Sequence, residues 1–234
     1  MGKKKKLLRF ADNKIFPNVF EPPLLEFFDK EKGGVVKHNF AGKWHSEVFK
    51  NNNPIVLELG CGKGEYSVGM GKKFPDVNYI GIDIKGARIW FGAKESLDLD
   101  LKNIAFLRTR IDFIDAFFEK DEVDEIWVTF PDPQPKDEWA EKRLTSKSFV
   151  DKYKKFLKKE GWIHLKTDSA FLYTNTLEVI QEQEYHLVHN NDDIYKNDMQ
   201  GYSGIEKEIL NIKTYYEGEF SKKGHLITYL KFRP

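Results

Sequence analysis

From residue 55 onward, short apolar runs alternate with longer stretches that have the hydrophobic spacing of helices. This alternation predicts an α/β protein in three layers, with a mostly parallel sheet covered by helices on both faces. The expected strands are 55–58, 79–83, 104–107, 126–130, 162–166, 185–189 and 226–232. The expected helices are 65–74, 87–97, 113–118, 146–158 and 171–181. Ligands of such open sheets bind at the carboxyl ends of the strands, so we look for functional residues there.

The first 50 residues lack this alternation and contain several Pro and Gly breaks. Asn51-Asn52-Asn53-Pro54 separates them from the first expected strand. We therefore expect residues 1–50 to form a basic N-terminal extension with short helices, and residues 51–234 to form the main domain. A chain of 234 residues is long enough to bury the core of one such domain.

The composition excludes several classes of protein. No apolar run approaches the roughly 18 residues of a membrane span, and the N-terminus lacks the apolar region of a signal peptide. Cys61 is the single cysteine, which excludes internal disulfides and favours a reducing cytoplasm. The six histidines show no metal-ligand spacing, so we expect no metal and no association with a membrane.

The formal net charge is +1, so the overall charge does not indicate a nucleic-acid partner. Lys3 to Lys6 and Arg9 nevertheless form a basic arm. Such an arm suits phosphate binding, but taken alone it slightly favours a solvated tail. A second group of lysines between Lys152 and Lys159 is interpreted as the exposed face of an amphipathic helix. Its inward residues would be Tyr153, Phe156 and Leu157.

A glycine-rich loop follows the first expected strand. It reads Glu58-Leu59-Gly60-Cys61-Gly62-Lys63-Gly64-Glu65. Glycines at alternate positions, Gly60, Gly62 and Gly64, let the backbone approach a ligand and turn into a helix N-terminus. A dinucleotide fingerprint requires glycine where Glu65 stands, and Glu58 would repel a pyrophosphate. S-adenosylmethionine carries a sulfonium and an ammonium, so this acidic loop favours it over NAD.

Acidic residues also follow the next two strands. Asp83 ends the second strand, where a carboxylate can accept hydrogen bonds from both ribose hydroxyls of a nucleotide. Asp112 follows the third strand and could reach the adenine, although Arg110 could occupy that position instead. These residues, together with the glycine loop, predict a nucleotide-type cofactor along one edge of the sheet.

The fourth expected strand runs into a segment with a proline at every second position. The segment is Phe130-Pro131-Asp132-Pro133-Gln134-Pro135-Lys136. Prolines remove backbone donors and fix φ, so neither a helix nor a strand can continue here. Asp132 is therefore expected on a stiff, extended segment at the carboxyl edge, beside the predicted cofactor.

Several motifs, taken in chain order, are similar to those of the bacterial tRNA (guanine-N7)-methyltransferase family. The glycine loop is common to all class I methyltransferases, whereas the ordered combination of Phe-Pro-Asp-Pro, Lys-Thr-Asp and Thr-x-x-Glu is specific. The resemblance covers nearly everything after residue 40. The matching text is Gly42-Lys43-Trp44, Asn53 to Gly60, Phe130 to Pro133, Lys142 to Thr145, His164 to Asp168 and Thr214 to Glu217.

The resemblance implies a class I methyltransferase fold (Rossmann-like, with a reversed last strand), S-adenosylmethionine as cofactor, and transfer of its methyl group to guanine N7 in the variable loop of tRNA. It implies no obligate protein partner. Glu58, Asp83 and the third-strand acid would bind the cofactor, and Asp132 would be the active-site carboxylate. The implied substrate contacts are Lys136, Asp168, Thr214 and Glu217, the last two in a loop closing on the substrate or on the cofactor's methionine end.

The sequence departs from the family just after Asp132. Gln134 stands where tryptophan is usual, and a normally basic stretch contains Asp137, Glu138 and Glu141. Fewer cations here predict weaker phosphate contacts, and the basic arm could supply part of the missing charge. Two other functions stay open: a methyltransferase for an exocyclic amine or small molecule, and a non-catalytic scaffold that binds S-adenosylmethionine and RNA.

Overall fold

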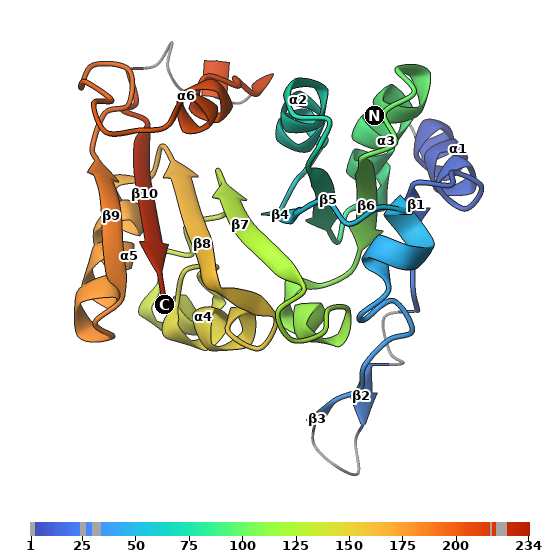
Figure 1. The fold of residues 1–234 in the computed structure, drawn as a ribbon, viewed down its shortest axis with the longest axis horizontal. Helices are drawn as coiled ribbons and strands as arrows, with labels where there is room; N and C mark the ends of the chain where they lie inside the picture. Colours follow the sequence, from blue (N-terminus) through green and yellow to red (C-terminus); the bar gives the residue numbers. More distant parts are fainter. Residues whose placement is uncertain (1–2, 24–26, 30–33, 216, 219–223) are drawn as a thin grey trace.

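The computed structural model describes residues 3–23, 27–29, 34–215, 217–218 and 224–234. Eight of the described strands form one sheet (Figure 1). All neighbours in it run parallel except β10, which is antiparallel to both β8 and β9. In spatial order the strands are β1 (Val19–Phe20), β6 (Ile104–Arg108), β5 (Asn78–Asp83), β4 (Ile55–Leu59), β7 (Val123–Thr129), β8 (Leu157–Thr167), β10 (Thr228–Arg233) and β9 (His186–Asn191). The predicted mostly parallel sheet with a reversed last strand is confirmed.

Helices cover both faces of this sheet. One face packs against α2 (Glu65–Lys73), α3 (Gly86–Asp98) and α6 (Gly204–Leu210). The other packs against η1 (Trp44–Phe49), η2 (Ile111–Ala116), α4 (Lys147–Tyr153) and α5 (Ala170–Glu182). Successive residues of a strand point to opposite faces, so a strand buried on both faces is apolar along most of its length, as in Ile55 to Leu57 of β4. The three-layer arrangement predicted from that pattern is confirmed.

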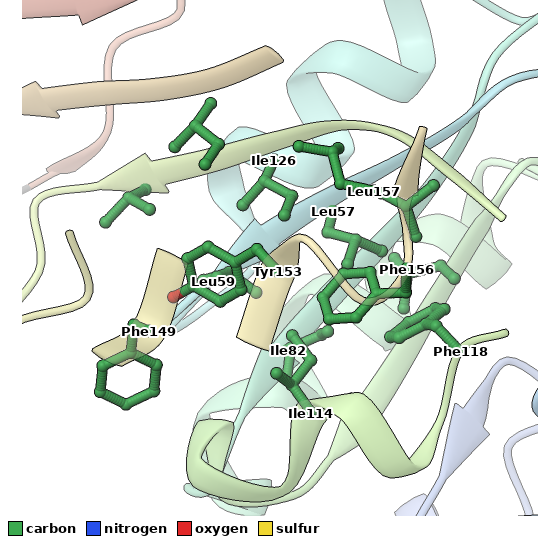
Figure 2. Close-up of a cluster of buried hydrophobic side chains, with 14 of the residues drawn as sticks. Leu57, Leu59, Ile82, Ile114, Phe118, Ile126, Phe149, Tyr153, Phe156 and Leu157 are labelled. Carbon is green, nitrogen blue, oxygen red and sulfur yellow. The ribbon is translucent and has the colours of Figure 1, made fainter. Parts of the chain in front are cut away.

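Figure 2 shows the larger of the apolar layers. Leu57, Leu59, Ile82 and Ile126 project from the strands, and Ile114 meets them from η2. Aromatic side chains fill the space between sheet and helices: Phe118, Phe149, Tyr153 and Phe156. This layer anchors the strands whose carboxyl ends form the site described below.

The helix expected at 146–158 was wrong at its C-terminal end. Ser146 caps α4, as its hydroxyl accepts a hydrogen bond from the Phe149 amide, but the helix ends at Tyr153. The amide of Phe156 then bonds the Tyr153 carbonyl in a tighter turn, and Leu157 already pairs with β7. Burial of Tyr153, Phe156 and Leu157 is as expected, but only the first lies on the helix.

The N-terminal region contributes to the main fold. In it, α1 (Lys3–Asn13) packs against α3, and β1 extends the sheet beside β6. A separate ribbon pairs β2 (Phe28–Asp29) with β3 (Gly34–Val35), away from the main sheet (Figure 1). The division of the chain near residue 50 stays a prediction. None of the described helices is long and apolar enough to cross a membrane.

Candidate active site

Two adjoining pockets open at the carboxyl edge of the sheet, where β4, β5, β6 and β7 end. Their cavity volumes are about 100 Å³ and about 630 Å³. Gly60, Arg88 and Phe130 line both pockets, so the two form one continuous groove. The larger lies within the range of sites that hold drug-sized ligands and cofactors.

The glycine loop forms the floor of this groove. Gly60, Gly62 and Gly64 have φ values of 76°, 57° and 74°, in the left-handed region that favours glycine. A Cβ on Gly60 would meet no atom within 4 Å, and one on Gly62 would meet only a carbonyl oxygen at 3.9 Å. A Cβ on Gly64 would lie 2.6 Å from the Phe106 ring. Gly60 and Gly62 thus leave space for a ligand, whereas Gly64 permits close packing of α2.

Glu58 lies at the bottom of the smaller pocket with 3% of its surface exposed. Its carboxylate accepts hydrogen bonds from the Ser67 amide (2.8 Å), the Ser67 hydroxyl and the Thr129 hydroxyl (2.7 Å). Burial raises the pKa of Glu58 to about 7, although these hydrogen bonds lower it. A cation in the pocket would favour the ionised form, so the site suits a positively charged ligand.

The strand-end acids line the larger pocket. Asp83 ends β5, and its carboxylate accepts hydrogen bonds from the amides of Gly62 (2.9 Å) and Lys85 (2.7 Å). Arg110 and Asp112 form an ion pair with each other, at 3.1 Å between Nη2 and Oδ2. Because both line the pocket, the choice between them stays open.

The proline-spaced segment forms the outer wall of the larger pocket. The strand β7 ends at Thr129, and both Phe130 (φ 47°) and Gln134 (φ 48°) adopt left-handed backbone conformations. Asp132 is exposed between them and lines the pocket, with its carboxylate accepting a 3.4 Å hydrogen bond from the Gln134 amide. Left-handed conformations in non-glycine residues are costly, and they persist where the surroundings fix the backbone.

Sequence reasoning gave no role to Arg143, which fixes this segment. Its guanidinium is buried and donates to the carbonyls of Gln134 (3.1 Å) and Lys136 (3.4 Å). It also lies 4.8 Å from the centroid of the Phe171 ring. The Lys-Arg pair was visible as part of a motif, but its position relative to the segment depends on the fold.

The structure separates the predicted substrate contacts. Lys136 is exposed, 4.6 Å from the Trp139 ring centroid, and does not line either pocket. Asp168 lies just beyond β8, with its carboxylate 3.7 Å from Nδ1 of His225. Thr214 lines the smaller pocket, whereas Glu217 is fully buried beside Lys166. Their roles in substrate binding stay predictions.

Arg88 and Lys166 are among the cations in or beside the groove that were not predicted. Arg88 lines both pockets, and nothing in the sequence distinguishes it from an ordinary helix residue. Lys166 is fully buried at the end of β8. A charged residue closing the apolar run Ile163-His164-Leu165 was the available signal. Across the described ranges, no group of three or more His, Cys, Asp or Glu side chains could hold a metal ion.

The strand order, the reversed last strand and the glycine loop at the carboxyl edge define a class I S-adenosylmethionine-dependent methyltransferase. Two solved structures share this fold at low sequence identity. An "Antibiotic Related Methyltransferase" matches with a TM-score of 0.57 and 14% identity, over 85% of this chain and 96% of that chain. The 16S rRNA methyltransferase KamB matches with a TM-score of 0.58 and 12% identity, over 84% and 96%.

Sequence comparison identifies the family within this class. A family model described as "Putative methyltransferase" matches residues 52–230. The tRNA (guanine-N(7)-)-methyltransferase of Bacteroides fragilis is 51% identical over 99% of this chain and 86% of its own length. That of Christiangramia forsetii is 47% identical over 100% and 99%. The chain belongs to the tRNA (guanine-N7)-methyltransferase family, and the predicted resemblance is confirmed.

Proposed function

We propose that this protein transfers a methyl group from S-adenosylmethionine to N7 of a guanine in the variable loop of tRNA, in the cytoplasm. One structural observation supports this proposal in addition to family membership. The groove that suits a cationic cofactor passes Phe130 and reaches Asp132, so a carboxylate stands where the groove meets solvent. A base entering from solvent would meet Asp132 at that point.

The residues of the groove fit the cofactor. Glu58 offers a buried carboxylate for its cationic end, and Asp83 offers acceptors for the ribose hydroxyls. The open space above Gly60 and Gly62 accommodates the chain between these two groups. When bound, S-adenosylmethionine supplies a methyl group activated by its sulfonium.

Guanine N7 carries a free lone pair and needs no general base. Catalysis then depends on positioning and on the placement of charge. We assign the positioning to Asp132, whose carboxylate can accept hydrogen bonds from the N1 and N2 donors of guanine. The methylated base is cationic, so the same carboxylate stabilises charge that grows in the transition state. The hydrogen bond from the Phe130 amide to the Lys166 carbonyl and the hydrogen bond from Arg143 to the Gln134 carbonyl hold the backbone around it.

The test is incubation with labelled S-adenosylmethionine and unmodified tRNA, followed by digestion and nucleoside analysis. Label in 7-methylguanosine is expected, and a tRNA with adenine in place of the variable-loop guanine should take up none. Label on an exocyclic amine would instead identify the second kind of methyltransferase. Absence of label, with cofactor binding intact, would identify a scaffold.

A further inference from the structure

Lys166 occupies an unusual position for a lysine. It is the last but one residue of β8, and its side chain is completely buried on the face of the sheet covered by α2 and α6. Its ammonium donates to the carbonyls of Leu210 (2.8 Å) and Ile212 (3.1 Å), where α6 ends. The last carbonyls of a helix have no partner within it, and a cation there also meets the negative end of the helix dipole. Lys166 therefore caps α6 from inside the protein.

The third partner of Lys166 is Glu217. Its Oε1 lies 2.8 Å from the ammonium, and neither side chain has any exposed surface. The Tyr195 hydroxyl donates to the same carboxylate. The amide of Thr214 also donates to Glu217 (3.4 Å), and the amide of Glu217 donates to the Thr214 hydroxyl (3.2 Å). The ion pair thus fixes the backbone that carries Thr214.

This backbone forms one wall of the smaller pocket. Thr214 lines that pocket, as does Glu58, and the amide of Tyr215 donates to Glu65 (3.2 Å), another lining residue. Lys166 also reaches the other side of the groove. Its ammonium lies 5.7 Å from the Phe130 ring centroid, and its carbonyl accepts a hydrogen bond from the Phe130 amide (2.8 Å). One residue therefore joins the wall of the cofactor pocket to the segment that carries Asp132.

We propose that Lys166 is a positioning residue, which through Glu217 holds the segment 210–215 against the cationic end of the bound cofactor. Glu217 then acts from within the protein by orienting Thr214, and not by touching the tRNA. This inference deepens the proposed function, on which it rests for the identity of the cofactor. It differs from a purely structural role, because a buried ion pair contributes little to stability when compared with apolar residues of similar size.

The test is Lys166→Met in the full-length protein, which keeps the apolar stem and removes the ammonium. The dissociation constant for S-adenosylmethionine, measured by calorimetry without tRNA, is expected to rise at least tenfold. Amide hydrogen exchange in residues 204–215 is expected to become faster. In turnover assays the KM for the cofactor should rise while the KM for tRNA stays unchanged.

Removing one partner leaves Glu217 buried and unpaired, so the single variant is expected to lose stability. The double variant Lys166→Met/Glu217→Gln removes both charges. If the single variant does not fold, the double variant tests whether Lys166 supports cofactor binding. It should melt above the single variant, because no unpaired carboxylate remains, yet keep the raised dissociation constant. A cofactor affinity within twofold of wild type in this variant overturns the proposal.

A matched control exists at the other end of α6. Lys231 pairs with Glu206 at 2.6 Å, both side chains are largely buried, and neither lines either pocket of the groove. Lys231→Met should lower the melting temperature and leave cofactor affinity unchanged. A loss of affinity equal to that of Lys166→Met would overturn the proposal, because any loosening of α6 would then weaken cofactor binding. If the wild type forms no 7-methylguanosine, the proposed substrate is wrong. The cofactor-binding assay contains no tRNA, so it tests the role of Lys166 independently of the substrate.

Discussion

Glu58→Gln should make the protein more stable at pH 8 and a poorer binder of its cofactor. The pKa of Glu58 is raised from 4.5 to about 7 by burial, so the folded state holds a proton that the unfolded state releases. The stability that this group contributes is complete below pH 4.5 and is lost as the pH rises through 7. A difference of about 2.5 pKa units corresponds to about 3 kcal/mol at pH 8.

Glutamine keeps the geometry and removes the charge. Its amide oxygen can accept from Ser67, and its NH₂ group can donate to the hydroxyl of Thr129. The variant should therefore gain up to about 3 kcal/mol at pH 8, which is several degrees in Tm for a chain of this size. At pH 4 the gain should nearly vanish, because Glu58 is then protonated in both states. Urea unfolding at several pH values measures this difference.

Glu58→Gln should weaken cofactor binding although it stabilises the folded protein. In the proposed function the ionised carboxylate meets a cation, so binding at pH 6 should release most of a proton per site, as expected for a pKa of about 7. Calorimetry in buffers of different ionisation enthalpy measures this release. Glu58→Gln should release no proton from this position and should bind at least tenfold more weakly.

Glu206→Gln is the matched control. Burial raises the pKa of Glu206, but hydrogen bonds from Lys231 and Ser203 outweigh it and lower the pKa to about 2. Its stability contribution is present above the unfolded-state pKa and is lost as the pH falls towards 2. This variant should therefore lose stability at pH 8 and bind cofactor normally. If Glu58→Gln also loses stability at pH 8, or if the wild type releases no proton on binding, the reasoning about Glu58 is refuted.

Four further changes test other parts of the protein. Asp132→Asn should keep cofactor affinity and lose most of kcat in the labelled-tRNA assay; near-normal turnover would remove Asp132 from the mechanism. Gly60→Ala should lower the free energy of unfolding by only about 1–2 kcal/mol, the cost of its left-handed backbone, but should weaken cofactor binding. Gly64→Ala should lower the free energy of unfolding, measured in urea, by more, because its Cβ would clash with Phe106. Deleting residues 1–9 should raise the KM for tRNA, most strongly at low salt, and leave cofactor affinity alone. An unchanged KM would show that the basic arm does not contact tRNA.

The sheet could be predicted from sequence because its interior strands are buried on both faces. Runs such as Ile55 to Leu57 are continuously apolar, and glycine, proline or acidic residues mark their ends. The two-residue strand β1 was missed, since Val19–Phe20 is too short to show a period. The end of α4 was misplaced because the spacing of Tyr153, Phe156 and Leu157 suits a helix that continues. Only the pairing of Leu157 with β7 decides between the two.

Some residues of the site could likewise be predicted from the sequence, and others could not. Gly60, Asp83 and Asp132 lie where strands end, and sequence order alone brings such positions to one edge of a parallel sheet. The hydrogen bonds of Lys166 and Arg143 to backbone carbonyls could not be predicted. Carbonyls are present at every residue, so the sequence cannot indicate which of them a buried cation will meet.

Three neighbouring strands carry a row of buried polar residues on the face of the sheet toward α2 and α6. Glu58 of β4 accepts a hydrogen bond from Thr129 of β7, and Thr129 lies opposite Lys166 of β8, which pairs with Glu217. Burial shifts the pKa of Glu58 up to about 7 and that of Lys166 down to about 8, so each is displaced towards its neutral form. Both shifts lower the stability of the folded protein near neutral pH. For Glu58 this is the cost expected of a charge held ready for a ligand. A cation bound beside Glu58 would restore its charge, and the segment anchored by Lys166 would exclude water from that pair and strengthen the attraction between them.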